Sequence, residues 1–126
     1  MKRFIISLVI LGVVLGLSFY GTRFVTSTYE QIDDALTQGE ELMEKGSYDK
    51  AKEDCLKAEK IFEKREPFLA AFVNHSILDE IGERVASVSP LADKESIPEF
   101  KSNCREAKIA LRHMRNDHVF ILGNLF

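Results

Sequence analysis

An apolar run that no charged side chain interrupts begins directly after Arg3. Residues 4–20 comprise 17 residues that follow Lys2 and Arg3 and hold no Asp, Glu, Lys or Arg. As a helix they span about 25 Å at about 1.5 Å per residue, and Gly21 and Thr22 can extend them toward the roughly 30 Å of a bilayer core. The run therefore predicts a membrane-spanning helix in which residues 4–20 contact lipid.

A cleaved secretion signal is the alternative interpretation, because it also combines a basic start with an apolar core. Such signals end in small residues at alternating positions, and the best match here is Gly16-Leu17-Ser18. No Ala-x-Ala sequence is present and no Cys lies nearby. The length of the run favours an uncleaved anchor, with a secreted soluble protein as the alternative.

Beyond the run, apolar and polar positions follow the period of an amphipathic helix. The steps between apolar positions alternate between three and four, which places them along one helical face. Two such helices are predicted over residues ~26–45 and ~48–65, with Pro67 as a stop signal. Their stripes are Val25, Tyr29, Ile32, Leu36, Gly39 and Met43, then Tyr48, Ala51, Cys55, Ala58 and Phe62.

The connection between these two helices has the chemistry of a tight turn. Gly46 suits the left-handed conformation that closes a helix, and the following Ser can cap the next one. Tyr48 opens the second helix, while Ala51 and Ala58 are small enough for close helix packing. The pattern resembles the second half of a tetratricopeptide repeat, but one unit cannot form an array, which needs about three. We interpret it as one repeat-like hairpin within another fold.

Two further helices are predicted toward the C-terminus. Residues 68–88 are apolar over a wide face and predict the most buried helix of the domain. Ser96-Ile-Pro-Glu has the composition of a helix start, and the stripe that follows is Phe100, Cys104, Ala107, Leu111 and Met114. No strand-like alternation occurs. The sequence therefore predicts an all-α protein, with one transmembrane helix leading into an antiparallel bundle.

The charges divide at residue 23. Residues 1–23 contain Lys2, Arg3 and Arg23 and no acid, whereas residues 24–126 hold all 20 acidic residues. We therefore separate an anchor, residues 1–23, from a helical domain, residues 24–126. The excess of basic residues before the span favours a cytoplasmic N-terminus and an extracytoplasmic domain. An acidic domain excludes nucleic acid as an expected partner.

Few residues suggest chemistry. His75 and Asp79 are four residues apart on one helix face, the spacing of a base and its orienting acid. No nucleophile or Gly-rich loop accompanies them, so a structural role is favoured. His113 and His118 are five apart, on different faces, and make a poor metal pair. We expect no enzyme activity, no metal and no cofactor; a metal-binding or enzymatic domain that uses His75 and Asp79 is the alternative.

Three other features bear on partners. Gly12 and Gly16 match the G-x-x-x-G spacing that lets two membrane helices approach closely, which makes a homodimer a candidate. Cys55 and Cys104 lie on apolar stripes and are a candidate disulfide if the domain faces an oxidising compartment, or free buried thiols otherwise. The apolar tail, residues 119–126, is expected to pack on the bundle, meet the membrane or insert into a partner.

The order of these features resembles a known family. A basic start, one membrane segment, the Gly-Ser-Tyr-Asp-Lys-Ala turn, the segment from Phe72 to Ile81 and a closing Asn-Leu-Phe are similar to domain-of-unknown-function family 4363. Its members are short membrane-anchored bacterial proteins, mainly of endospore-forming Gram-positives. The resemblance implies an architecture and no activity. We expect a non-catalytic interaction or scaffold module at the outer face of the cell membrane, whose partner is another membrane or envelope protein.

Overall fold

The computed structural model describes the backbone of residues 1–125 and the side chains of residues 1–116. Over this part the protein is all-helical: four α-helices and two short 3₁₀ turns account for every regular element described. The all-α prediction is confirmed. The helices are α1 (Lys2–Glu44), α2 (Tyr48–Leu69), α3 (His75–Ala86) and α4 (Ile97–Leu125); the 3₁₀ turns are η1 (Ser89–Leu91) and η2 (Lys94–Ser96).

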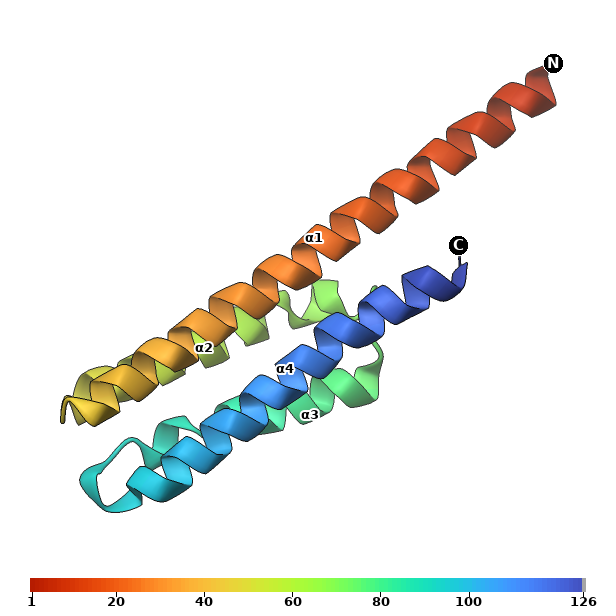
Figure 1. The fold of residues 1–126 in the computed structure, drawn as a ribbon. Helices are drawn as coiled ribbons and strands as arrows, with labels where there is room; N and C mark the ends of the chain where they lie inside the picture. Colours follow the sequence, from red (N-terminus) through yellow and green to blue (C-terminus); the bar gives the residue numbers. More distant parts are fainter. Residues whose placement is uncertain (126) are drawn as a thin grey trace.

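Helix α1 is unbroken from the apolar run into the domain. The first turns of α1 project beyond the other helices, and the C-terminal half of α1 packs among them (Figure 1). The first buried residue is Gly21. From Val25 to Met43 burial follows the predicted stripe, with Ile32 and Leu36 fully buried. The two halves of α1 are therefore one continuous helix, exposed in the first half and packed against other helices in the second.

The chain turns back at each connection, so that every helix lies against its neighbours in sequence (Figure 1). Helix α1 makes its most extensive contact with α2 and also packs on α4, while α3 packs on α2 and α4. The α1–α2 turn contains Gly46 with φ 81°, a conformation that glycine adopts without steric cost.

Small residues bring α1 and α2 close together. A Cβ added at Gly39 would lie 3.1 Å from Cys55 Sγ and 3.5 Å from the Ala51 carbonyl oxygen. Ala51 and Ala58 are fully buried. Close backbone approach excludes voids and water along this seam, where larger side chains would force the helices apart.

Two predicted boundaries are wrong. Pro67 does not stop α2, which continues to Leu69 with the proline inside its last turn; the proline removes only the one hydrogen bond that an N–H at position 67 would donate to the Glu63 carbonyl oxygen. Residues 68–88 are not one helix. The side chain of Asn74 accepts a hydrogen bond from the Ser76 N–H and starts α3 at His75, as Asn does at helix N-termini.

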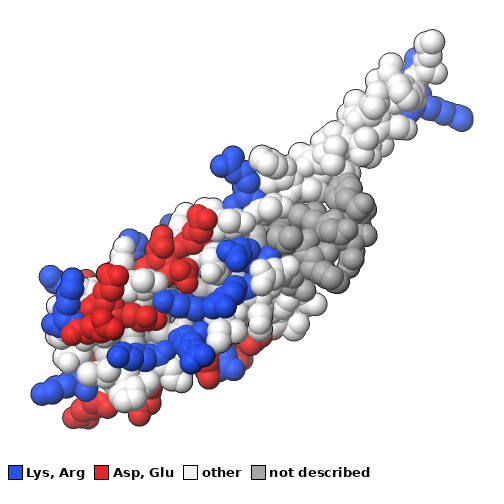
Figure 2. All heavy atoms as spheres, viewed as in Figure 1, with Lys and Arg blue, Asp and Glu red and all other residues white. Residues whose placement is uncertain are grey.

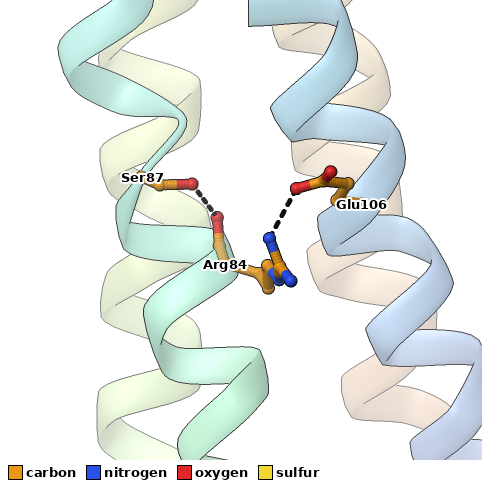
Figure 3. A network of polar contacts seen from close by, with 3 residues as sticks. All are labelled: Arg84, Ser87 and Glu106. Atoms are coloured by element: carbon orange, nitrogen blue, oxygen red, sulfur yellow. Dashed lines mark hydrogen bonds and ion pairs between the residues drawn. The ribbon is translucent and has the colours of Figure 1, made fainter.

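Helix α3 is also not buried over a wide face. Only Leu78, Ile81 and Val85 are buried along it. Its outer side carries Arg84, whose guanidinium forms an ion pair with Glu106 of α4, while the Ser87 hydroxyl donates to the Arg84 carbonyl oxygen (Figure 3). Both charged side chains are half exposed, so the pair contributes little to stability. It marks where the surfaces of α3 and α4 meet.

Candidate functional site: the anchor and its junction with the domain

The N-terminal half of α1 has the surface of a membrane span. It is the one helix in the described part of the chain that is long and apolar enough to cross a bilayer. Its apolar side chains are exposed, from Phe4 at 68% to Val14 at 46%. Figure 2 shows this half as an uncharged shaft with basic side chains at its tip, while the charged residues cover the domain. Such a surface matches lipid and not water.

Two hydroxyl groups of the N-terminal half of α1 donate hydrogen bonds within the helix. The Ser7 hydroxyl donates to the Arg3 carbonyl oxygen at 2.9 Å, and the Thr22 hydroxyl donates to the Ser18 carbonyl oxygen at 2.9 Å. Hydroxyl groups that bond back to the preceding turn need no water. These two residues are therefore compatible with an apolar environment.

Aromatic rings gather where the span meets the domain. The Tyr20 and Phe24 rings stack with centroids 6.3 Å apart, and the Phe24 ring meets Phe68 of α2 edge-on at 6.4 Å. The Phe72 ring lies directly against Gly21, where an added Cβ would approach it to 2.6 Å. We call residues 19–28 of α1 together with residues 65–72 the junction. Only glycine at position 21 allows this close approach.

Arg65 ties α2 to α1 within the junction. Its guanidinium donates to the Thr28 hydroxyl at 3.0 Å and to the Gln31 amide oxygen at 2.9 Å. The same group lies 5.6 Å from the centre of the Phe24 ring, within the range of a cation–π interaction. Thr28 is fully buried and donates in turn to the Phe24 carbonyl oxygen. The domain is thus fastened to the base of the span by directional contacts.

The sequence did not reveal the junction residues Arg65, Phe68 and Phe72. It predicted no role for Arg65, and it placed Phe68 and Phe72 in one buried helix over residues 68–88. The available signal was an apolar residue, Phe68, directly after a proline near the end of a helix. A single sequence could not reveal that residues 65–72 pack against Gly21 of α1.

The pair His75 and Asp79 lies at the surface of α3. His75 is the first residue of the helix, both side chains are exposed, and no hydrogen bond joins them among the described contacts. His113 is also exposed, and the side chain of His118 lies outside the described residues, as do those of the tail, residues 119–126. No group of three or more potential metal ligands occurs in the part of the structure that is described.

Cys55 and Cys104 are buried free thiols beside α1. The Cys104 thiol faces the Leu36 carbonyl oxygen at 3.8 Å, and Cys55 faces Gly39. Burial, assisted by nearby acidic residues, raises the pKa of Cys55 to about 12, and burial with Glu40 raises the pKa of Cys104 further. Both thiols are protonated and unreactive at neutral pH. Their disulfide stays a prediction, which thiol labelling of denatured, non-reduced protein would decide.

The remaining residues singled out from the sequence lie at helix contacts or on the open span. Tyr48, the first residue of α2, is half buried against the core. Gly12 and Gly16 lie on the span, and a Cβ at either would meet nothing within 4 Å. The glycine surface is therefore open to a second helix, and the homodimer stays a prediction.

The fold and the junction define a class: a helical domain built directly onto one apolar, N-terminal helix. The family model for the domain of unknown function DUF4363 matches residues 19–125. The chain belongs to this family, as the resemblance in the sequence indicated. No match is found among curated proteins or among solved structures.

Proposed function

We propose that the protein is a membrane-anchored, non-catalytic helical module that holds its domain at the outer face of the cell membrane and binds another membrane or envelope protein. The observation that carries the proposal is the continuity of α1 from Lys2 to Glu44. One helix provides both the exposed apolar span and the central core stripe. A domain mounted in this way is held at a fixed height and orientation, which suits presentation to a partner.

Orientation is supported by the charges that flank the span. Lys2, Arg3 and the amino terminus precede the span, whereas Arg23 is the first charge after it. Basic residues are retained on the cytoplasmic side. The domain, which begins at residue 24, then lies outside the cell.

An interaction role is supported by the surface rather than by any enclosed site. His75 and Asp79 are exposed on α3, where solvent surrounds them and nothing would position a substrate. The α1–α2 hairpin, with its Gly46 turn and its Ala51 and Ala58 contacts, is similar to one tetratricopeptide unit within an antiparallel bundle. We infer that helical surface, not a catalytic pocket, is what this domain offers.

Labelling of single added cysteines in intact cells tests the topology. A Glu53→Cys variant places a thiol on the exposed side of α2, and a cysteine inserted directly after Met1 places one before the span while keeping Lys2 and Arg3. A membrane-impermeant maleimide should label Glu53→Cys in intact cells and the inserted cysteine only after permeabilisation. The unaltered chain is the control, because its two buried, protonated thiols should stay unlabelled. The reverse pattern would contradict the orientation.

The non-catalytic role is tested with a partner crosslink. A crosslinker on the domain surface should join the full chain to one envelope protein in native membranes. A double variant, His75→Ala with Asp79→Ala, should retain both this crosslink and any cellular phenotype. A phenotype lost with the crosslink intact would instead indicate chemistry at the pair.

A further inference from the structure

One large apolar side chain of the domain faces outward without cover. Phe68 is 65% exposed. Among the described side chains beyond residue 20, the other exposed large apolar residues are Leu56 at 38% and Ile109 at 36%. A phenylalanine ring left in water is unfavourable, because its apolar surface gains stability when it is removed from water. Single exposed apolar residues are common on protein surfaces, so it is the place of Phe68 in the fold that gives its exposure a meaning.

Phe68 belongs to the junction between the span and the domain. Its ring contacts Phe24, which stacks on Tyr20, the last residue of the apolar run. The following turn holds Phe72 against Gly21. The α2–α3 corner thus lies beside α1 within about one helical turn of the end of the span.

The straight path of α1 fixes this corner relative to a membrane. No break separates the span from the domain, so residues level with Tyr20 and Arg23 lie at the level of the lipid headgroups once the span is in the bilayer. Aromatic side chains settle in this interfacial layer, and arginines at the same level suit lipid phosphates. Helix α4 also directs its C-terminal end toward this end of the molecule (Figure 1).

We propose that the α2–α3 corner, residues 65–72, is a second membrane contact, in which Phe68 inserts into the interfacial layer of the bilayer. This rests on the proposed anchoring of α1. The occupant is a lipid surface, because the corner continues the surface of the span itself. The domain then sits on the membrane by two elements, and its tilt is restricted as well as its height.

The absence of tryptophan from the chain allows a direct test with the full-length protein. Three single variants, Val9→Trp, Phe68→Trp and Leu56→Trp, are each reconstituted in phosphatidylcholine–phosphatidylglycerol vesicles with and without brominated acyl chains, which quench tryptophan on contact. Leu56 is the matched control: it is exposed on the same helix, about 18 Å further from the span. Matching circular dichroism spectra establish that all three variants fold alike.

The proposal predicts loss of fluorescence in brominated lipid for Val9→Trp and Phe68→Trp, with a blue-shifted spectrum for both, and an unchanged signal for Leu56→Trp. An unquenched Val9→Trp would overturn the anchor itself. A quenched Val9→Trp beside a Phe68→Trp that behaves like Leu56→Trp would overturn only the second contact. A Phe68→Trp spectrum that is blue-shifted but unquenched would mean that a second copy of the protein covers the corner, which also overturns the proposal.

Discussion

The two halves of α1 have the same backbone and opposite side-chain patterns. In residues 4–20 apolar side chains surround the helix and remain exposed. In residues 21–44 they occupy one stripe, which α2 and α4 cover, while acidic side chains occupy the other side. A helix that is apolar all round requires an apolar surrounding, whereas an amphipathic helix requires a partner on one side only. The two halves of one helix thus have surfaces suited to two different surroundings, and Gly21 is the first buried residue after the apolar half.

The largest effect is expected from charge in the first half. Leu11→Arg with Leu15→Arg places two guanidinium groups near the middle of the span, at about 2.5–3.5 kcal/mol each on insertion scales. The double variant should leave the membrane fraction. Leu56→Arg, an exposed change on α2, should remain in it. Retention of the double variant in the membrane fraction after alkaline carbonate washing would show that membrane association does not depend on the apolar surface of residues 4–20.

Much of this fold could be predicted because the helical pattern of apolar positions is regular and continues over many turns. The stripes of α1, α2 and α4 are buried at the predicted positions from Val25 to Met114, except that Tyr29 and Tyr48 are partly buried. The prediction failed at residues 68–88, where a continuous apolar pattern concealed a turn. The apolar pattern predicts a helix through Asn74, although the short side chain of Asn74 competes for backbone hydrogen bonds and favours an N-cap.

The junction was less predictable than the helices because its contacts are non-local. Arg65 reaches Thr28 across 37 positions of sequence, and Gly21 accommodates Phe72 from a different element. A single sequence shows which residues share a helix face, but not which faces meet. The local signals were limited to Phe24, which closely follows an apolar run, and Phe68, which follows Pro67.

A leucine in each half gives the next comparison. Leu36 is fully buried and Leu8 is 52% exposed. Leu36→Ala should destabilise the domain by about 2–5 kcal/mol, because a cavity adds to the lost apolar burial. Leu8→Ala should leave the domain unchanged. Urea titration, followed by thiol labelling of Cys55 and Cys104, measures unfolding of the domain without interference from the span. Equal effects of the two variants would contradict the division of α1 into an exposed half and a core half.

Glycines in the two halves should also respond differently. Gly39→Val places new methyl groups against Cys55 and Ala51, and overpacking of this kind costs about 1–3 kcal/mol. Gly16→Val meets open space within the same helix and should leave domain stability unaltered. The same urea titration compares them. A neutral Gly39→Val would show that the α1–α2 seam can open, contrary to the close packing of the structure.

The smallest expected difference separates two hydroxyl groups that bond to the preceding helical turn in the same way. The Ser7 hydroxyl donates to the Arg3 carbonyl oxygen and the Thr28 hydroxyl donates to the Phe24 carbonyl oxygen. Only the Thr28 hydroxyl also accepts a hydrogen bond from the Arg65 guanidinium. Thr28→Val keeps the shape and removes that acceptor, at about 1 kcal/mol because Arg65 retains other partners. Ser7→Ala removes a bond whose carbonyl acceptor stays within the helix, and should be silent for the domain. An Arg65→Met background should abolish the effect of Thr28→Val; if the effect persists there, it comes from the buried position of Thr28 and not from the link between α1 and α2.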